Sequence, residues 1–382
     1  MFSRRLRPIL TLLSLVTLIL ACTTEEDCSL NGICSSNSTC HCGPGWIGSD
    51  CGRLDLVPAA RWTGYNHTNY TDPSYLGSYG NSSWGGRIVQ DREDPRLFHL
   101  LVDQFRNGCG LSGWRPTSFI ARAESRNGPQ GPYVWAQNTT SSFRHNADVV
   151  WSPADDKYLL WAIGADIADP TSCKSISGSQ FPAVISVSSA SSIRGPWTPF
   201  RVAINGTNPA PWPLYEERNK TSQITLAAED LKIYAAPQWD GNYTRINSPV
   251  PWNTTDYSPT WTEDPFIWRD KRGNWHALAH WMIDIVEHDG RKYPRTGAHM
   301  FSRNLAEGWH FKVQEAFNST VTFTDGAVET FNRRERSKIF FDEDLTPLYL
   351  VSGVQALNSK TSFTLVQPIG DRWHEYEKRL GF

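Results

Sequence analysis

The sequence predicts an all-β protein in which a small disulfide-rich module precedes a five-bladed β-propeller. Six of the eight cysteines lie between Cys22 and Cys51. Short alternating apolar segments recur along the rest of the chain, and they fall into five units of similar length. We therefore expect a signal peptide (1–21), the module (22–52), a linker and loop (53–79) and the propeller (80–382).

The N-terminus has the pattern of a secretory signal peptide. An arginine-rich start precedes an apolar run from Ile9 to Leu20. This run is shorter than the roughly 20 residues of a membrane span, so we interpret it as a cleaved signal. An uncleaved anchor and a bacterial lipoprotein signal ending at Cys22 are the alternatives. We expect no membrane contact after the signal is removed.

The composition is consistent with export. Ten Asn-x-Ser/Thr sequons are spread along the chain, and such sites are glycosylated in a eukaryotic secretory route. They lie at Asn37, Asn66, Asn69, Asn81, Asn138, Asn205, Asn219, Asn242, Asn253 and Asn318. The net charge is −2 and there is no basic stripe, which argues against nucleic acid as a partner. We predict a secreted, extracellular, N-glycosylated protein.

The clustered cysteines predict disulfides rather than a metal site, because about 30 residues cannot bury enough apolar surface to fold without crosslinks. The segment from Cys40 to Cys51, Cys-His-Cys-Gly-Pro-Gly-Trp-Ile-Gly-Ser-Asp-Cys, resembles the signature of EGF-like modules. The resemblance covers residues 22 to 52 and implies the pairs Cys22–Cys34, Cys28–Cys40 and Cys42–Cys51. A protein partner for this module is left open.

The two remaining cysteines, Cys109 and Cys173, lie in polar segments rich in Gly and Ser. In an oxidising compartment we predict that they form a disulfide between two loops. Two free buried thiols are the alternative.

Five repeated heads predict the propeller. Each unit opens with a short polar head and an extended apolar run, and the heads begin at Trp84, His145, Thr207, Glu263 and Arg333. Units of about 60 residues fit blades of four antiparallel strands, and a closed ring protects strand edges. The C-terminal residues 371–380 are expected either to form a short helix or to close the ring against the first blade.

The heads are expected to converge on one pocket, because the innermost strands of a propeller line its axis. Amides, carboxylates and aromatic faces together suit a sugar, and two carboxylates can act on a glycosidic bond. The predicted substrate-binding residues are Trp84, His145, Asn208, Asp264, His276, His299, Arg334 and Arg336. Trp84 and Trp114 are the candidates for stacking on the sugar.

The arginines of the fifth head have three interpretations. Strand alternation would place Arg334 and Arg336 on one face. Guanidinium groups there would suit an acidic glycan, or would hold the carboxylate of Glu263 in place. A solvated surface is the third interpretation.

The repeat from about 80 to 370 resembles the five-bladed propeller of glycoside hydrolase family 43. Glu263-Asp-Pro-Phe-Ile matches the Glu-Gly-Pro-x-Ile pattern of that family, which implies that Glu263 is the general acid of an inverting glycosidase. Gly85 stands where the base Asp of the family is expected, and Asn208 stands where its pKa-tuning Asp is expected. Asp148 is therefore our first candidate for the base, followed by Asp264 and Glu335.

Two other interpretations stay open. In the first, the propeller binds a glycan without cleaving it. In the second, the reaction differs, and His145, His276 or His299 activates the water or nucleophile. We expect no cofactor and no transition-metal site, and a structural calcium or sodium ion at the axis is left open. The expected partner is a polysaccharide or glycan, acidic or neutral.

Overall fold

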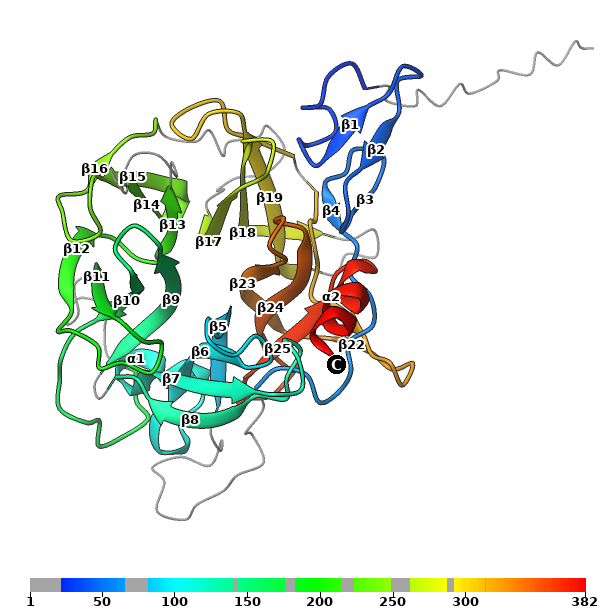
Figure 1. Ribbon diagram of the computed structural model, residues 1–382. Helices are drawn as coiled ribbons and strands as arrows, with labels where there is room; N and C mark the ends of the chain where they lie inside the picture. Colours follow the sequence, from blue (N-terminus) through cyan, green and yellow to red (C-terminus); the bar gives the residue numbers. More distant parts are fainter. Residues whose placement is uncertain are drawn as a thin grey trace, which may run out of the picture.

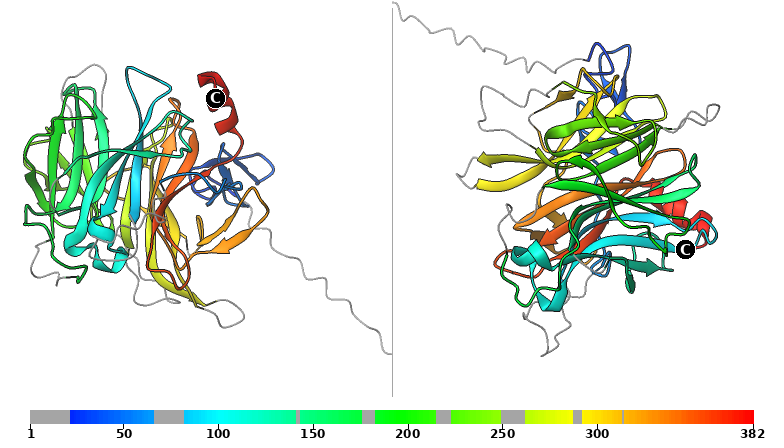
Figure 2. Two further views of the ribbon diagram at one scale, coloured as in Figure 1. Left: turned by 90° about the horizontal axis from the view of Figure 1, so that it is seen from below. Right: turned by 90° about the vertical axis from the view of Figure 1, so that its left-hand side faces the viewer.

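The computed structural model describes residues 22–65, 82–140, 143–175, 183–214, 223–248, 262–286, 292–312 and 314–382. Five antiparallel sheets surround a common axis, and a small module lies against the outside of the ring (Figure 1, Figure 2). The predicted all-β fold with a five-bladed propeller is confirmed. The predicted signal peptide (1–21) and residues 66–79 of the predicted loop lie outside the described residues. Within the described ranges, no helix is long and apolar enough to cross a membrane.

Blades 1 to 4 each have four strands that neighbour one another in sequence order. Blade 1 contains β5 (Ser83–Gln90), β6 (Phe98–Phe105), β7 (Ser118–Ser125) and β8 (Val134–Asn138). Blade 2 contains β9 (Arg144–Ser152), β10 (Lys157–Gly164), β11 (Val184–Ala190) and β12 (Arg201–Asn205). Blade 3 contains β13 (Ala210–Leu214), β14 (Gln223–Ala228), β15 (Lys232–Ala236) and β16 (Thr244–Arg245). Blade 4 contains β17 (Thr262–Arg269), β18 (Trp275–Val286), β19 (Lys292–Ser302) and β20 (His310–Phe311).

Blade 5 is completed by the N-terminal part of the chain. Its own strands are β23 (Arg333–Phe341), β24 (Pro347–Gln355) and β25 (Phe363–Pro368). Residues 56–65 form isolated antiparallel bridges at their two ends, from Leu56 to Ile369 just after β25 and from Tyr65 to Thr364 within it, whereas Ala59 pairs with Phe323. Part of the segment that we predicted as a linker therefore contacts the outer edge of the last blade at two points. The C-terminal residues form helix α2 (Arg372–Leu380) and do not close the ring.

Apolar layers between neighbouring sheets hold the ring together. Leu101 and Ile120 of blade 1 pack in one cluster with Val149 and Leu160 of blade 2. Blade 1 meets blade 5 through a second cluster, which also receives Tyr376 of α2. Buried side chains of this size each stabilise the fold by about 1.5–3 kcal/mol, so the blades cannot separate without a large loss of free energy.

The innermost strand region of every blade contains one residue in the left-handed backbone conformation. These residues are Gly85, Asn146, Asn208, Asp264 and Arg336, with φ between 50° and 60°. In four of the five blades the strand register shifts at this point. Gly, Asn and Asp adopt this conformation readily, but for Arg336 it costs about 1–2 kcal/mol. The five turns bring equivalent side chains to the axis.

The N-terminal module consists of two small sheets, β1 (Gly32–Cys34) with β2 (Cys40–Cys42) and β3 (Trp46–Ile47) with β4 (Arg53–Leu54). Its disulfides join Cys22 to Cys34, Cys28 to Cys40 and Cys42 to Cys51, which are the pairs that the resemblance implies. Trp46 stacks on Trp268 of blade 4, with ring centroids 6.4 Å apart. The module is thus packed onto the propeller.

In the described residues, four short helical turns and one separate hairpin lie outside the five blade sheets. The 3₁₀ turns η1 (Arg106–Gly108) and η2 (Leu111–Gly113) precede the single turn α1 (Trp114–Thr117) between β6 and β7. A further 3₁₀ turn, η4 (Glu229–Leu231), follows β14. A separate hairpin, β21 (Thr320–Thr322) with β22 (Val328–Thr330), precedes blade 5.

Candidate functional site

A cavity of about 390 Å³ opens at the axis, where the five turns meet. Every blade contributes to its wall, as do the loop before β7 and the turn η4. The lining residues are Trp84, Leu111, Ser112, Trp114, Arg115, His145, Asn146, Ile163, Thr207, Asn208, Glu229, Glu263, Arg333, Glu335, Arg336 and Gln355. Of the predicted site residues, Trp84, His145, Asn208, Glu263 and Arg336 are brought together here. We call this cavity the axial pocket.

Glu263 occupies the head position of blade 4 and faces the axial pocket. Burial raises the pKa of its carboxyl to about 7, and the negative charge of the neighbouring Asp264 acts in the same direction. Nδ1 of His280 lies 4.0 Å from the Glu263 carboxylate. The carboxyl therefore keeps its proton up to near neutral pH, which is what a general acid requires.

A narrow second cavity lies beneath the axial pocket and is lined by Asp103, Asp264 and Arg336. The Arg336 guanidinium lies 3.5 Å from Asp103 and 3.7 Å from Asp264, so it bridges two buried carboxylates. A Cβ atom at Gly85 would lie 2.9 Å from the Cβ of Arg336. Arg336 thus occupies the place that a longer side chain at position 85 would need. Asp264, predicted to bind substrate, lies in this lower layer.

Asp103 fixes the geometry between blades 1 and 2. The backbone N–H groups of Asn146 and Ala147 donate to its carboxylate at 2.9 and 3.2 Å. Nδ1 of His145 lies 3.3 Å from the same group. Burial raises the pKa of Asp103 to about 6, although Arg336 opposes this shift. The Asn146 amide in turn donates to Asn208, which links blade 2 to blade 3.

Asp148, our first candidate for the base, does not line the axial pocket. Its carboxylate is fully buried between Arg87 Nη1 at 2.9 Å and Lys338 Nζ at 2.7 Å. The left-handed turn at Asn146 breaks the alternation that we used to place Asp148 beside it. The structure gives Asp148 an ion pair between three blades in place of contact with the pocket.

His145 forms part of the pocket wall together with an aromatic ring. Its imidazole stacks on Trp114, with centroids 4.3 Å apart, and Nδ1 lies 2.7 Å from Ser118 Oγ. Burial lowers the pKa of His145 well below its usual range, and Arg336 and Arg115 lower it further, so the ring is neutral. Trp84 lines the pocket but is almost completely buried.

The head of blade 5 differs from the prediction by two residues. The left-handed residue is Arg336, so Glu335 corresponds to Glu263 and Arg333 lies farther out. Arg333 donates to Glu335 at 3.1 Å, and both line the axial pocket. Arg334 points away from the pocket, because it is buried within the blade and donates to Gln367 at 2.8 Å. The turn at Arg336 therefore separates the two arginines that alternation placed on one face.

His276 and His299 lie beneath the module and not in the axial pocket. His276 Nδ1 is 3.1 Å from His299 Nε2, and its Nε2 is 3.3 Å from Asp270. Asn31 of the module lies 3.3 Å from His299 Nε2. Burial is the main cause that lowers the pKa of both histidines. The two histidines therefore connect the module to blade 4. They lie away from the axial pocket, where we had predicted them to bind substrate.

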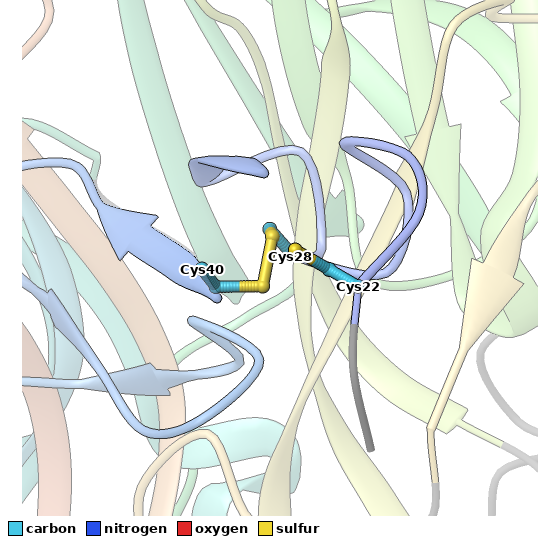
Figure 3. Close-up of side chains that lie close together, drawn as sticks. All are labelled: Cys22, Cys28 and Cys40. Atoms are coloured by element: carbon cyan, nitrogen blue, oxygen red, sulfur yellow. A yellow bond between two sulfur atoms is a disulfide. The ribbon is translucent and has the colours of Figure 1, made fainter. Parts of the chain in front are cut away.

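Two groups of side chains have metal-ligand chemistry at short range in the described ranges. Cys22, Cys28 and Cys40 lie close together, but Cys28 is bonded to Cys40 and Cys22 to Cys34, so their sulfurs are not available to a metal (Figure 3). Glu263, Asp264 and His280 offer ligand atoms that lie within 4.8 Å of one another. These three residues could hold an ion below the pocket.

Several pocket residues were not predicted from the sequence. Arg115 comes from the loop before β7, and Glu229 comes from η4. Neither stands in a repeated head, which was the signal that we used. Two features of the sequence pointed to the loop that carries Arg115. One is the neighbouring Trp114, and the other is the predicted disulfide between Cys109 and Cys173, which fixes this loop.

Solved structures share this fold. The chain is similar to a glycoside hydrolase with a TM-score of 0.52 and 10% identity, over 82% of this chain and 92% of that one. A protein of unknown function from Dyadobacter fermentans gives a TM-score of 0.51 and 10% identity, over 83% and 99%. An endo-arabinase from Bacteroides thetaiotaomicron has 14% identity over 81% and 98%, with a TM-score of 0.45. At these identities the similarity shows the propeller fold alone. The sequence matches no protein-family model and no curated protein.

Proposed function

We propose that this chain is a secreted carbohydrate-active protein, and that it hydrolyses a glycosidic bond with Glu263 as the general acid. The main observation in support is the half-buried carboxyl of Glu263, whose pKa is raised to about 7 in an axial pocket lined by aromatic, amide and charged groups. The resemblance of the Glu263 segment to the family 43 pattern supports the same role.

Hydrolysis also needs a second carboxylate across the bond. Glu229 and Glu335 line the same pocket as Glu263, whereas Asp148 does not. Burial raises the pKa of Glu229. Glu335 lies near enough to Glu263 for its charge to raise the pKa of that residue. We therefore place the base at Glu335 or Glu229 and no longer at Asp148.

The exported, glycosylated state is part of the proposal. Five of the ten sequons lie in the described ranges, and all five asparagines are exposed: Asn37, Asn138, Asn205, Asn242 and Asn318. All eight cysteines form disulfides, which favours an oxidising compartment.

A glycan-binding propeller without catalysis is the second candidate. The observation that favours it is Arg336, which fills the space beside Gly85 where the base of the family would stand. In that case the N-terminal module would supply contact with a protein partner.

The test is a hydrolysis screen of the full chain against neutral and acidic polysaccharides and aryl glycosides. Glu263→Gln should slow cleavage of natural linkages by about 10²–10⁴-fold, yet spare substrates whose leaving group needs no proton. Glu335→Gln and Glu229→Gln identify the base, and Glu375→Gln on the exposed face of α2 is the control. Unchanged activity in Glu263→Gln would exclude it as the acid. Glycan binding without any turnover would favour the binding propeller.

A further inference from the structure

Arg115 stands out among the charged groups of the axial pocket. It lies in α1 next to Trp114 and lines the axial pocket together with Trp114 and His145. Its guanidinium lies 4.1 Å from the centroid of the Trp114 ring. In the part of the chain that the structure describes, this guanidinium has no hydrogen bond and no carboxylate partner.

The other pocket arginines are already paired. Arg333 donates to Glu335, and Arg336 lies between Asp103 and Asp264. Their charges are therefore compensated within the protein. Arg115 has the opposite environment: partial burial lowers its pKa, and the nearby positive charge of Arg336 adds to that shift. An anion placed beside Arg115 would relieve both effects.

The loop that carries Arg115 is held in place. The disulfide between Cys109 and Cys173 anchors its first half. A Cβ atom at Gly113 would lie 2.4 Å from the carbonyl oxygen of Cys173, so the two segments are in close contact. Thr117 Oγ1 donates to the Gly113 carbonyl at 2.8 Å at the other end of the turn. These contacts fix the backbone of the loop before any ligand arrives, and packing on Trp114 restricts the guanidinium, so less ordering is needed on binding.

We infer that Arg115 binds the anionic group of the ligand, so that the axial pocket takes an acidic glycan bearing a carboxylate or a sulfate. This inference rests on the proposed carbohydrate function and names its substrate class. A guanidinium offers two parallel N–H donors that match either oxyanion, while Trp114 behind it holds the fork in one plane. The predicted recognition of an acidic glycan is thereby moved to Arg115 from Arg334, which is buried in blade 5, and from Arg336, which is paired with Asp103 and Asp264.

The experiment measures binding of three probes to the full chain by calorimetry: a trigalacturonate, a sulfated galactotriose and neutral galactotriose. Wild type should bind at least one acidic probe more tightly than the neutral one, and added salt should reduce this preference. Arg115→Gln should weaken the acidic complex by about ten- to a hundredfold and leave the neutral complex unchanged. Arg115→Lys keeps the positive charge but lacks the two parallel donors, so its affinity for the acidic probe should lie between those of wild type and Arg115→Gln.

The matched control is Arg92→Gln. Arg92 also packs on an indole, 3.5 Å from the Trp151 ring centroid, but it is exposed and does not line the axial pocket. The Arg92→Gln variant should bind all three probes with the affinity of wild type. Thermal unfolding verifies that every variant is folded. Equal affinity of wild type for acidic and neutral probes, or unchanged acidic binding in Arg115→Gln, would overturn the inference but keep the proposed function. No binding or turnover of any glycan would refute both.

Discussion

The raised pKa of Glu263 makes a prediction about stability that does not depend on finding the substrate. The folded protein holds this proton up to about pH 7, whereas the unfolded chain releases it near the ordinary value of 4.5. Between these values the folded state binds more protons than the unfolded state, so stability falls as the pH rises through this window. Each pKa unit corresponds to 1.36 kcal/mol. The side chain is 29% exposed, and partial solvent screening brings the expected loss to about 2–3 kcal/mol.

The substitution Glu263→Gln removes this titration. Relative to wild type, the variant should gain about 2–3 kcal/mol of unfolding free energy between pH 4 and pH 8. Urea unfolding with intact disulfides, followed by tryptophan fluorescence at pH 4, 6 and 8, measures the difference. Glu375→Gln removes an exposed carboxylate of α2 and should show no such trend. A constant difference between Glu263→Gln and wild type across this range would refute the assigned environment of Glu263.

Three further predictions concern the frame around the pocket. Asp148→Asn removes the counter-charge of the buried Lys338 and of the partly buried Arg87. It should lower the unfolding free energy, measured with urea, by about 3 kcal/mol. A loss below about 1 kcal/mol would contradict its structural role. Gly85→Asp restores the carboxylate of the family pattern, but its Cβ atom would lie only 2.9 Å from the Cβ of Arg336. This crowding should cost about 1–3 kcal/mol of unfolding free energy without raising activity. A faster enzyme would disprove this account. Replacing both Cys109 and Cys173 by serine removes the crosslink that closes a loop of 64 residues. The free energy of unfolding should fall by about 4 kcal/mol, and the midpoint of thermal unfolding should fall with it. An unchanged midpoint would speak against the crosslink.

The repeat of polar heads was enough to predict the fold and to bring five of the predicted residues to one pocket. The predicted location in the pocket holds for Trp84, His145 and Glu263, because each of them directly precedes the left-handed residue of its blade. It failed where we relied on strict strand alternation. One bulged residue reverses the direction of the following side chains, which is why Arg334 and Arg336 have different environments.

The remaining site residues had no periodic signal. Asp103 belongs to the second strand of blade 1, and its function depends on backbone groups of blade 2. Arg115 and Glu229 come from turns between strands. The positions of these residues at the pocket result from packing between elements that are far apart in the sequence. A local sequence pattern cannot predict such packing.

The N-terminal edge of blade 5 determines the order in which this protein can be completed. Residues 56–65 leave the ribosome before any blade exists, yet their partner strand β25 is made last. This edge must therefore stay unpaired until synthesis has nearly ended, and ring closure is a contact between distant parts of the chain that forms slowly. The disulfide module just ahead of it can fold early and shorten the free segment. A chain that begins after residue 65 would lack these contacts and leave more of the edge of β25 open to pairing with other molecules.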